Sequence, residues 1–252
     1  MGTRFLRSLT STQGKTTLKH VKALGGSLFG YACQEGILKF NPFLGVKLPD
    51  DAIESKETKH YTMEQAEDMI SALVDHVDCQ LILALSCFLG LRPGETAALR
   101  WEDFDAESIH IRRSVVCGIV GTPKTLEPVA CLPLIDQARV PLELWRMKSG
   151  NPSTGWVISS RNDTPIDLHN LINRVIKPVL KEAGINYFTG LYAGRRGACT
   201  AVVEATGGNY AVAQALLRHK SMVVTLNTYK KQITPAAFKA GMKLFQNTIT
   251  TS

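Results

Sequence analysis

The stretch from Leu81 to Leu89 constrains the fold most, because it is apolar on every side. A helix with apolar residues on all its faces is typical of the interior of a globular domain. The chain has 252 residues, of which 44% are hydrophobic, and this is enough for one large domain with or without a small partner domain. The sequence therefore predicts a globular domain built around a buried helix.

Helical periodicity dominates the rest of the chain. Thr62 and Gln65 have the spacing of a capping box, and they precede an amphipathic helix that contains Ala66, Ile70 and Leu73. Pro93 fits the first turn of a short helix that follows the buried one. Five further helices are predicted at about 136–148, 167–182, 195–205, 209–217 and 235–246.

Only one region favours strands. Ile109 and Ile111 alternate with polar residues, and two strand-like segments, 114–120 and 128–132, flank a turn at 121–124. The predicted fold class is therefore mainly α with a small antiparallel β-sheet (α+β).

The N-terminal part looks like a separate piece. Ser11 and Thr12 are predicted to cap a helix that runs to about Glu35 and ends at Gly36, with an apolar stripe along one face. One helix cannot bury its own stripe. We therefore expect residues 1–45 to be the C-terminal remnant of a helical domain, residues 46–60 to be a linker, and residues 61–252 to form the main domain.

The charge is positive and unevenly distributed. The net charge is +7 and the pI is about 9.1. Residues 1–49 carry seven basic residues against one acid, residues 50–78 carry nine acids against two lysines, and residues 174–231 carry nine basic residues against two acids. This segregation favours a polyanionic partner, although a solvated charge pattern without a partner would look the same.

The six cysteines are scattered, mostly in apolar runs, and none forms a CxxC pair. A zinc site is therefore not expected, and buried free thiols in a reducing cytoplasm are the better interpretation. The chain contains neither a signal peptide nor an apolar run of about 18 residues, so we expect it to be neither secreted nor membrane-spanning.

Three local phrases carry the functional signal. The first runs from Leu89 through Arg92 and Glu95 to Asp105, and the second is Tyr192-Ala-Gly-Arg195-Arg196. The third runs from Leu217-Arg-His219-Lys-Ser through Thr225 to Tyr229. In this order they resemble the catalytic boxes of the tyrosine recombinases, or phage-type integrases, and the resemblance covers nearly the whole chain.

The resemblance implies a catalytic role for each box. Arg92 and Arg195 would clamp the scissile phosphate, a task that suits a guanidinium because it is bidentate and always protonated. Tyr229 would attack the phosphate and hold the DNA 3′ end as a phosphotyrosine. His219 would contact a non-bridging oxygen, and Lys124, in Pro-Lys-Thr on the predicted hairpin turn, would protonate the leaving 5′ oxygen. No metal or other cofactor is implied.

Local sequence suggests how the two arginines are held. Glu95 follows Arg92 by three residues, so its carboxylate should orient the guanidinium. Arg195 is predicted to open a helix, where backbone N–H groups favour a phosphate.

Two residues and one spacing depart from the family pattern. Tyr192 stands where the family usually has a histidine, and Arg218 stands where a glycine is common. His219 and Tyr229 are ten residues apart rather than the usual nine. A tyrosine can donate a hydrogen bond to phosphate, but it is a poor general base at neutral pH. Tolerated variation and loss of activity both fit these departures.

Further basic residues are candidates for DNA binding. Lys15, Lys19 and Lys22 fall near one face of the first long helix, and Arg196 and Lys220 adjoin the catalytic boxes. A solvated helix face explains the three lysines equally well.

The resemblance implies double-stranded DNA as the partner, a tetramer on DNA, a monomer in solution and, in a prokaryote, a cytoplasmic, nucleoid-associated protein. The last helix, 235–246, would dock either onto a neighbouring protomer or onto its own domain.

We expect a site-specific DNA recombinase. Two alternatives remain open at the sequence level: a non-catalytic DNA-binding relative, and a type IB topoisomerase-like enzyme that relaxes DNA without a specific site. An unrelated basic helical protein is the third and weakest alternative.

Overall fold

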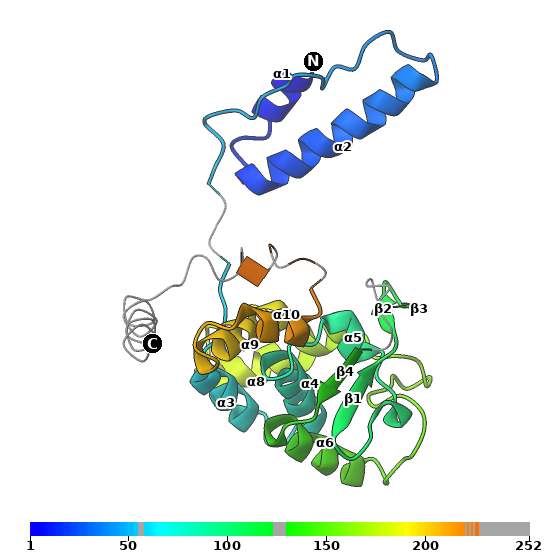
Figure 1. Cartoon of the computed structure of the whole chain (residues 1–252), viewed down its shortest axis with the longest axis vertical. Coiled ribbons are helices and arrows are strands. Elements are labelled where there is room, and N and C mark those ends of the chain that lie inside the picture. The colour runs from blue at the N-terminus through cyan, green and yellow to red at the C-terminus, as the bar shows by residue number, and fades with distance from the viewer. Residues whose placement is uncertain (55–57, 123–129, 220, 222, 224, 227–252) are drawn as a thin grey trace, which may run out of the picture. The chain divides into compact units, whose positions relative to one another are not determined.

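The computed structural model describes residues 1–54, 58–122, 130–219, 221, 223, 225 and 226. The chain divides into two compact units, Met1–Thr58 and Lys59–Ser252. Figure 1 shows the helices and strands of both units. Lys124, Lys220 and Tyr229 lie outside the described residues, as does the predicted helix 235–246.

The first unit contains two helices, α1 (Gly2–Arg7) and α2 (Lys15–Gln34). Its core is a small cluster of buried side chains: Leu6, Leu18, Phe43, Val46 and Ala52. Two of these, Val46 and Ala52, fall in the predicted linker, so part of that segment packs onto the first unit.

The predicted start of the long helix is wrong, since α2 is capped by Gly14 rather than by Ser11 or Thr12. Hydrogen bonds from Thr12 and Gln13 to Leu9 continue the turn that follows α1, and this leaves the helix to begin later. The predicted end is confirmed: Gly36 adopts a positive φ of 73° directly after the helix.

The second unit is built around α4 (Val77–Cys87), which has buried residues on all its faces. Helix α3 (Met63–Ala72) begins with the predicted capping box, in which Gln65 N donates to Thr62 Oγ1 over 3.1 Å and Thr62 N donates to Gln65 Oε1 over 3.1 Å. Helices α3, α6 (Asp136–Lys148) and α9 (Leu191–Ala205) pack against α4 (Figure 1). This unit also contains α5 (Pro93–Ala97), a 3₁₀ turn η1 (Trp101–Asp103) and α10 (Tyr210–Leu217).

The predicted helix 167–182 is interrupted. It comprises α7 (Leu168–Leu171), a π-helical segment η2 (Ile172–Ile176) and α8 (Lys177–Glu182). Pro178 has no N–H to donate to the carbonyl four residues earlier, which explains why the regular hydrogen-bond pattern is displaced here. Gly184 ends the helix with a φ of 77°, as predicted.

The strands form two small antiparallel sheets instead of one. Strand β1 (Ser108–Ile111) pairs with β4 (Ala130–Pro133), and β2 (Ser114–Val116) pairs with β3 (Ile119–Gly121). The predicted strand 114–120 is wrong, because the β2–β3 hairpin turns inside it at Cys117-Gly118, where both residues have positive φ. The predicted turn at 121–124 lies partly outside the described residues. The mainly α fold with small antiparallel sheets is confirmed.

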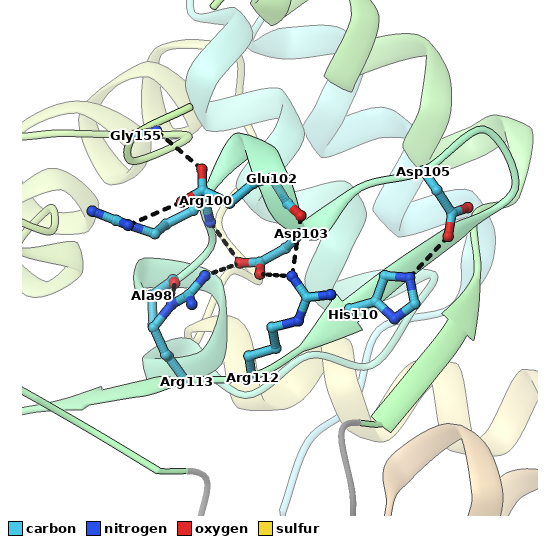
Figure 2. A network of polar contacts seen from close by, with 9 residues as sticks. All are labelled: Ala98, Arg100, Glu102, Asp103, Asp105, His110, Arg112, Arg113 and Gly155. Atoms are coloured by element: carbon cyan, nitrogen blue, oxygen red, sulfur yellow. Dashed lines mark hydrogen bonds and ion pairs between the residues drawn. The ribbon is translucent and has the colours of Figure 1, made fainter. Parts of the chain in front are cut away.

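Asp103 ties the 3₁₀ turn η1 to the segment between β1 and β2 (Figure 2). Its carboxylate is only 1% exposed and accepts hydrogen bonds from Arg100 N over 2.9 Å, from Arg113 Nη2 over 2.5 Å and from Arg112 Nη1 over 3.2 Å. Arg113 Nε also donates to the carbonyl of Ala98 over 3.4 Å. One buried carboxylate thus fixes the base of the β2–β3 hairpin.

The cysteines divide into two groups. Cys79, Cys87 and Cys199 are buried free thiols, as predicted, whereas Cys117 and Cys131 are exposed and Cys33 is half-buried. The interpretation as buried residues is therefore wrong for Cys117 and Cys131. Cys117 lies at the hairpin turn, and the side chain of Cys131 faces away from the core on β4.

Candidate active site

Arg92 lies at the N-cap of α5, directly before Pro93, as the sequence predicted. Glu95 accepts two hydrogen bonds from it: from Arg92 N to Oε2 over 2.8 Å and from Arg92 Nη1 to Oε1 over 2.7 Å. Glu95 is 2% exposed, so its carboxylate has little access to water. The expected contact between Glu95 and the Arg92 guanidinium is present.

Gly94 allows the hairpin to pack beside Arg92. A Cβ atom on Gly94 would lie 2.4 Å from the carbonyl oxygen of Val115 in β2. Real side chains do not approach a backbone oxygen so closely, so only glycine fits here. The base of the β2–β3 hairpin is consequently held against α5, close to the first arginine.

Arg195 does not open a helix, and that prediction is wrong. Helix α9 begins at Leu191, four residues earlier, after Gly190 with a φ of 118°. The hydroxyl of Tyr61 accepts hydrogen bonds from Thr189 N and Gly190 N over 2.6 and 2.9 Å, which holds the chain at this start. The free backbone N–H groups of the helix start are therefore not at Arg195.

The Arg195 side chain instead points into the protein. It is 5% exposed, and its guanidinium donates hydrogen bonds to the carbonyl oxygens of Gly90 and Leu217. Gly90 lies directly before the Arg92 segment, and Leu217 ends α10. Arg195 therefore joins the first and third sequence phrases.

Arg218 is the site residue whose contact the sequence did not reveal. It has a left-handed backbone conformation, with φ 53° and ψ 47°, at the end of α10. Its Nη2 lies 2.6 Å from Glu95 Oε2, and its Nη1 donates to the carbonyl of Leu216 over 2.8 Å. The only sequence signal was an arginine at a position where the related family commonly has glycine.

His219 directly follows Arg218 in the sequence, and Thr225, from the same sequence phrase, holds its side chain. Its Nδ1 lies 2.9 Å from the hydroxyl of Thr225, which is fully buried. Gln214 Nε2 donates to the backbone carbonyl of His219 over 2.9 Å. The hydrogen bond with Thr225 therefore fixes the position of Nδ1 in the imidazole ring.

The charges of these groups influence each other. Burial alone would raise the pKa of Glu95, but the charge of Arg218 and the hydrogen bonds from Arg92 outweigh it and hold that pKa below its ordinary value. Burial, together with the charges of Arg92 and Arg218, lowers the pKa of Arg195 to about 9, so this guanidinium remains charged at pH 7. Three positive groups thus surround one carboxylate.

His219, in contrast to Glu95 and Arg195, is kept uncharged by the same neighbours. Burial, and then the charges of Arg195, Arg92 and Arg218, lower its pKa to about 4. The imidazole is therefore neutral at pH 7, when one ring nitrogen donates and the other accepts. A neutral histidine beside three arginines can exchange a hydrogen bond or a proton with an anionic ligand.

The other predicted site residues lie around this cluster or apart from it. Tyr192 is on α9 and is 57% exposed, and its neighbour Arg196 donates from Nε to the carbonyl of Lys59 over 2.7 Å. Lys15 is paired with Glu54 over 2.7 Å in the first unit. Lys19 and Lys22 also lie on α2 in that unit, Lys19 exposed and Lys22 half-buried.

Neither a metal site nor a membrane span is found in the described part of the chain. Among those residues, no three His, Cys, Asp or Glu side chains are grouped so that they could hold a metal ion. None of the described helices is long and apolar enough to cross a membrane.

Comparison with known proteins identifies the family of this chain. The phage integrase family matches residues 59–234, which include all three sequence phrases. The chain belongs to the phage integrase family. The chain is 27% identical over 252 residues to the tyrosine recombinase XerC-like protein of Caldanaerobacter subterraneus subsp. tengcongensis (strain DSM 15242 / JCM 11007 / NBRC 100824 / MB4). The match covers 86% of this chain and 63% of that relative.

A second relative and a solved structure extend the comparison. Prophage integrase IntR of Escherichia coli (strain K12) is 29% identical over 134 residues, which are 51% of this chain and 32% of IntR. The chain thus spans less than two thirds of either curated relative. Among solved structures, the chain is similar to the Tn1549 transposon integrase (residues 82–397) in complex with circular intermediate DNA, with a TM-score of 0.76 and 20% sequence identity. The match covers 97% of this chain and 84% of the integrase chain. That likeness shows the fold.

Proposed function

We propose that this phage integrase family member is the catalytic part of a site-specific DNA recombinase that cuts and rejoins DNA through a 3′-phosphotyrosyl intermediate. The observation that carries the proposal is the cluster of Arg92, Arg195 and His219, in which Arg195 is buried and the other two side chains are half-buried. The three residues come from three separate segments of the domain and lie within electrostatic reach of each other. Such a cluster suits a phosphodiester whose charge increases in the transition state.

The reaction that we propose balances without a metal or an energy source. The Tyr229 hydroxyl gives its proton to water as its oxygen attacks phosphorus, and the bond from phosphorus to the 5′ oxygen breaks. Lys124 gives the leaving 5′ oxygen a proton and regains one from water. The number of phosphodiester bonds is unchanged, so the reverse attack by a 5′ hydroxyl rejoins a strand. Arg92 and Arg195 neutralise the non-bridging oxygens, and neutral His219 hydrogen-bonds to one of them.

The N-terminal unit, Met1–Thr58, is assigned a DNA-binding role in this proposal. We propose that Met1–Thr58 belongs to a helical core-binding domain, in which Lys19 and Lys22 of α2 contact phosphates of double-stranded DNA. Lys15 is a weaker candidate, because its pairing with Glu54 has to break first. We further propose that Arg196 and Lys220 contact DNA near the cut, and that the protein is a monomer in solution and a tetramer on DNA.

The first experiment tests the nucleophile. Supercoiled plasmid carrying the DNA that flanks this gene is incubated with the chain, quenched with SDS, and examined for protein bound covalently to a 3′ end. Tyr229→Phe is expected to abolish the adduct, because phenylalanine lacks the oxygen that attacks phosphorus. Tyr31→Phe, a matched change at an exposed position of α2, should keep it. An adduct that persists in Tyr229→Phe would refute the assignment.

One alternative function has specific support. Tyr192 replaces a histidine of the family pattern, so a non-catalytic DNA-binding relative is the second candidate. That candidate predicts measurable DNA binding with no adduct from the wild-type chain.

A further inference from the structure

Arg218 is an unusual residue for its backbone conformation. Its φ of 53° and ψ of 47° place it in the left-handed region, which glycine adopts freely and other residues adopt at a cost. The side chain is nevertheless only 9% exposed and turns towards Glu95. A surface arginine would not need this conformation, so a contact inside the protein has to compensate for it.

That contact is the shared carboxylate of Glu95. Oε1 accepts from Arg92 Nη1 over 2.7 Å, while Oε2 accepts from Arg92 N over 2.8 Å and from Arg218 Nη2 over 2.6 Å. Both oxygens are therefore occupied, and the two arginines are fixed by one acceptor. With Arg218 removed, Oε2 would keep only the backbone donor, and the carboxylate would be held less firmly by its two bonds to Arg92.

The guanidinium of Arg218 also keeps unused hydrogen-bonding capacity. Its Nε is buried and has no hydrogen-bond partner among the described residues. The charge lies within electrostatic reach of Arg195 and His219. A buried, unpaired donor beside two other arginines is costly unless an anion is to be bound there.

We propose that Arg218 is a positioning residue of the phosphate site, which holds the Arg92 guanidinium in place through Glu95 and adds a third positive charge to the cluster. The inference rests on the proposed recombinase function. It assigns a role to a position at which the family pattern commonly has glycine.

The first test measures the rate of adduct formation in a single turnover on the plasmid described above. Arg218→Gly removes the guanidinium and leaves the residue best suited to the backbone, so the melting temperature should stay near that of the wild type. We expect the rate to fall about ten- to a hundredfold, less than the 10²–10³ typical of a donor that touches the transition state. Millimolar guanidinium ion should restore part of the rate, and Arg218→Lys should lie between the two.

Arg161→Gly provides the matched control, because Arg161 is an exposed loop arginine and its loss removes the same charge. It should leave the rate unchanged. A wild-type rate in Arg218→Gly would overturn the inference. A loss that follows a lowered melting temperature and does not respond to guanidinium would also overturn it, since that result indicates a structural role only.

A second measurement needs no DNA and separates this inference from the proposed function. The Arg92 Nε–H signal is assigned in a ¹⁵N NMR spectrum by its disappearance in Arg92→Lys, and its order parameter is compared between wild type and Arg218→Gly. We expect the order parameter to fall in Arg218→Gly and to stay constant in Arg161→Gly. If Arg92 is equally ordered without Arg218, the inference is wrong even where the wild type forms an adduct. If the wild type forms no adduct but Arg92 loses order, only the proposed function fails.

Discussion

Asp103→Ala should destabilise the second unit by about 3 kcal/mol. Removing one partner of a buried ion pair costs about 3–5 kcal/mol when the charges left behind stay buried. Asp103 is 1% exposed, but its partners Arg112 and Arg113 are 39% and 25% exposed, so water can solvate their charges again and the lower figure applies. Since about 1 kcal/mol shifts the melting temperature of a unit of this size by about 2–4 °C, the expected loss is about 6–12 °C.

Tryptophan fluorescence is the assay of choice for this change. All three tryptophans of the chain, Trp101, Trp145 and Trp156, lie in the second unit, so thermal unfolding followed by their emission reports on that unit alone. Asp103→Asn, which keeps an acceptor for the backbone but loses the charge, should lie between wild type and Asp103→Ala. Asp105→Asn is the matched control: this carboxylate pairs with His110 on the surface and should contribute far less. A melting temperature of Asp103→Ala within about 2 °C of the wild type would refute the reasoning.

Three further predictions concern the groups around the cluster. Tyr61→Phe removes the hydroxyl that accepts hydrogen bonds from two backbone N–H groups at the start of α9, and it should lower the free energy of unfolding in urea by about 1–2 kcal/mol. Tyr187→Phe removes a single long hydrogen bond of 3.4 Å and should lower it by less. Equal losses in the two variants would contradict this account. Burial and the neighbouring arginines lower the pKa of His219 from 6.5 to about 4. The contribution of His219 to the free energy of unfolding should therefore be complete above about pH 6.5 and be lost as the pH falls towards 4. An NMR titration midpoint near 6.5 for the His219 imidazole would contradict this prediction. Tyr192→His should increase the rate of adduct formation, since an imidazole can hydrogen-bond to phosphate and also accept a proton at pH 7; a slower variant would show that Tyr192 is adapted to this site.

Local chemistry was predictable from the sequence. The capping box at Thr62 and the burial of the helix predicted around Leu81–Leu89 depend on residues within a few positions. The structure has both, with the helix itself spanning Val77–Cys87. The contact between Arg92 and Glu95 also spans only three residues. Each of these features is determined by a periodicity or a spacing that can be counted along the chain.

Contacts between distant segments were not predictable in this way. The start of α9 was misplaced because Tyr61, more than a hundred residues earlier, supplies the hydroxyl that holds Gly190. The pair of Arg218 and Glu95 is separated by 123 residues, and no local pattern marks it. A hairpin turn inside the predicted strand 114–120 was missed because the Cys117-Gly118 dipeptide was not recognised as a two-residue turn. The assignments of Lys124 and Tyr229 remain predictions.

The exposed thiol at the β2–β3 turn makes the protein suitable for site-directed labelling. Burial raises the pKa of the thiols of Cys79, Cys87 and Cys199, so these three react slowly with maleimides at pH 7. With the two other accessible cysteines changed to serine, a fluorophore would attach to Cys117 alone. Its emission would then follow, in real time, how the hairpin beside the first arginine responds when a duplex is added.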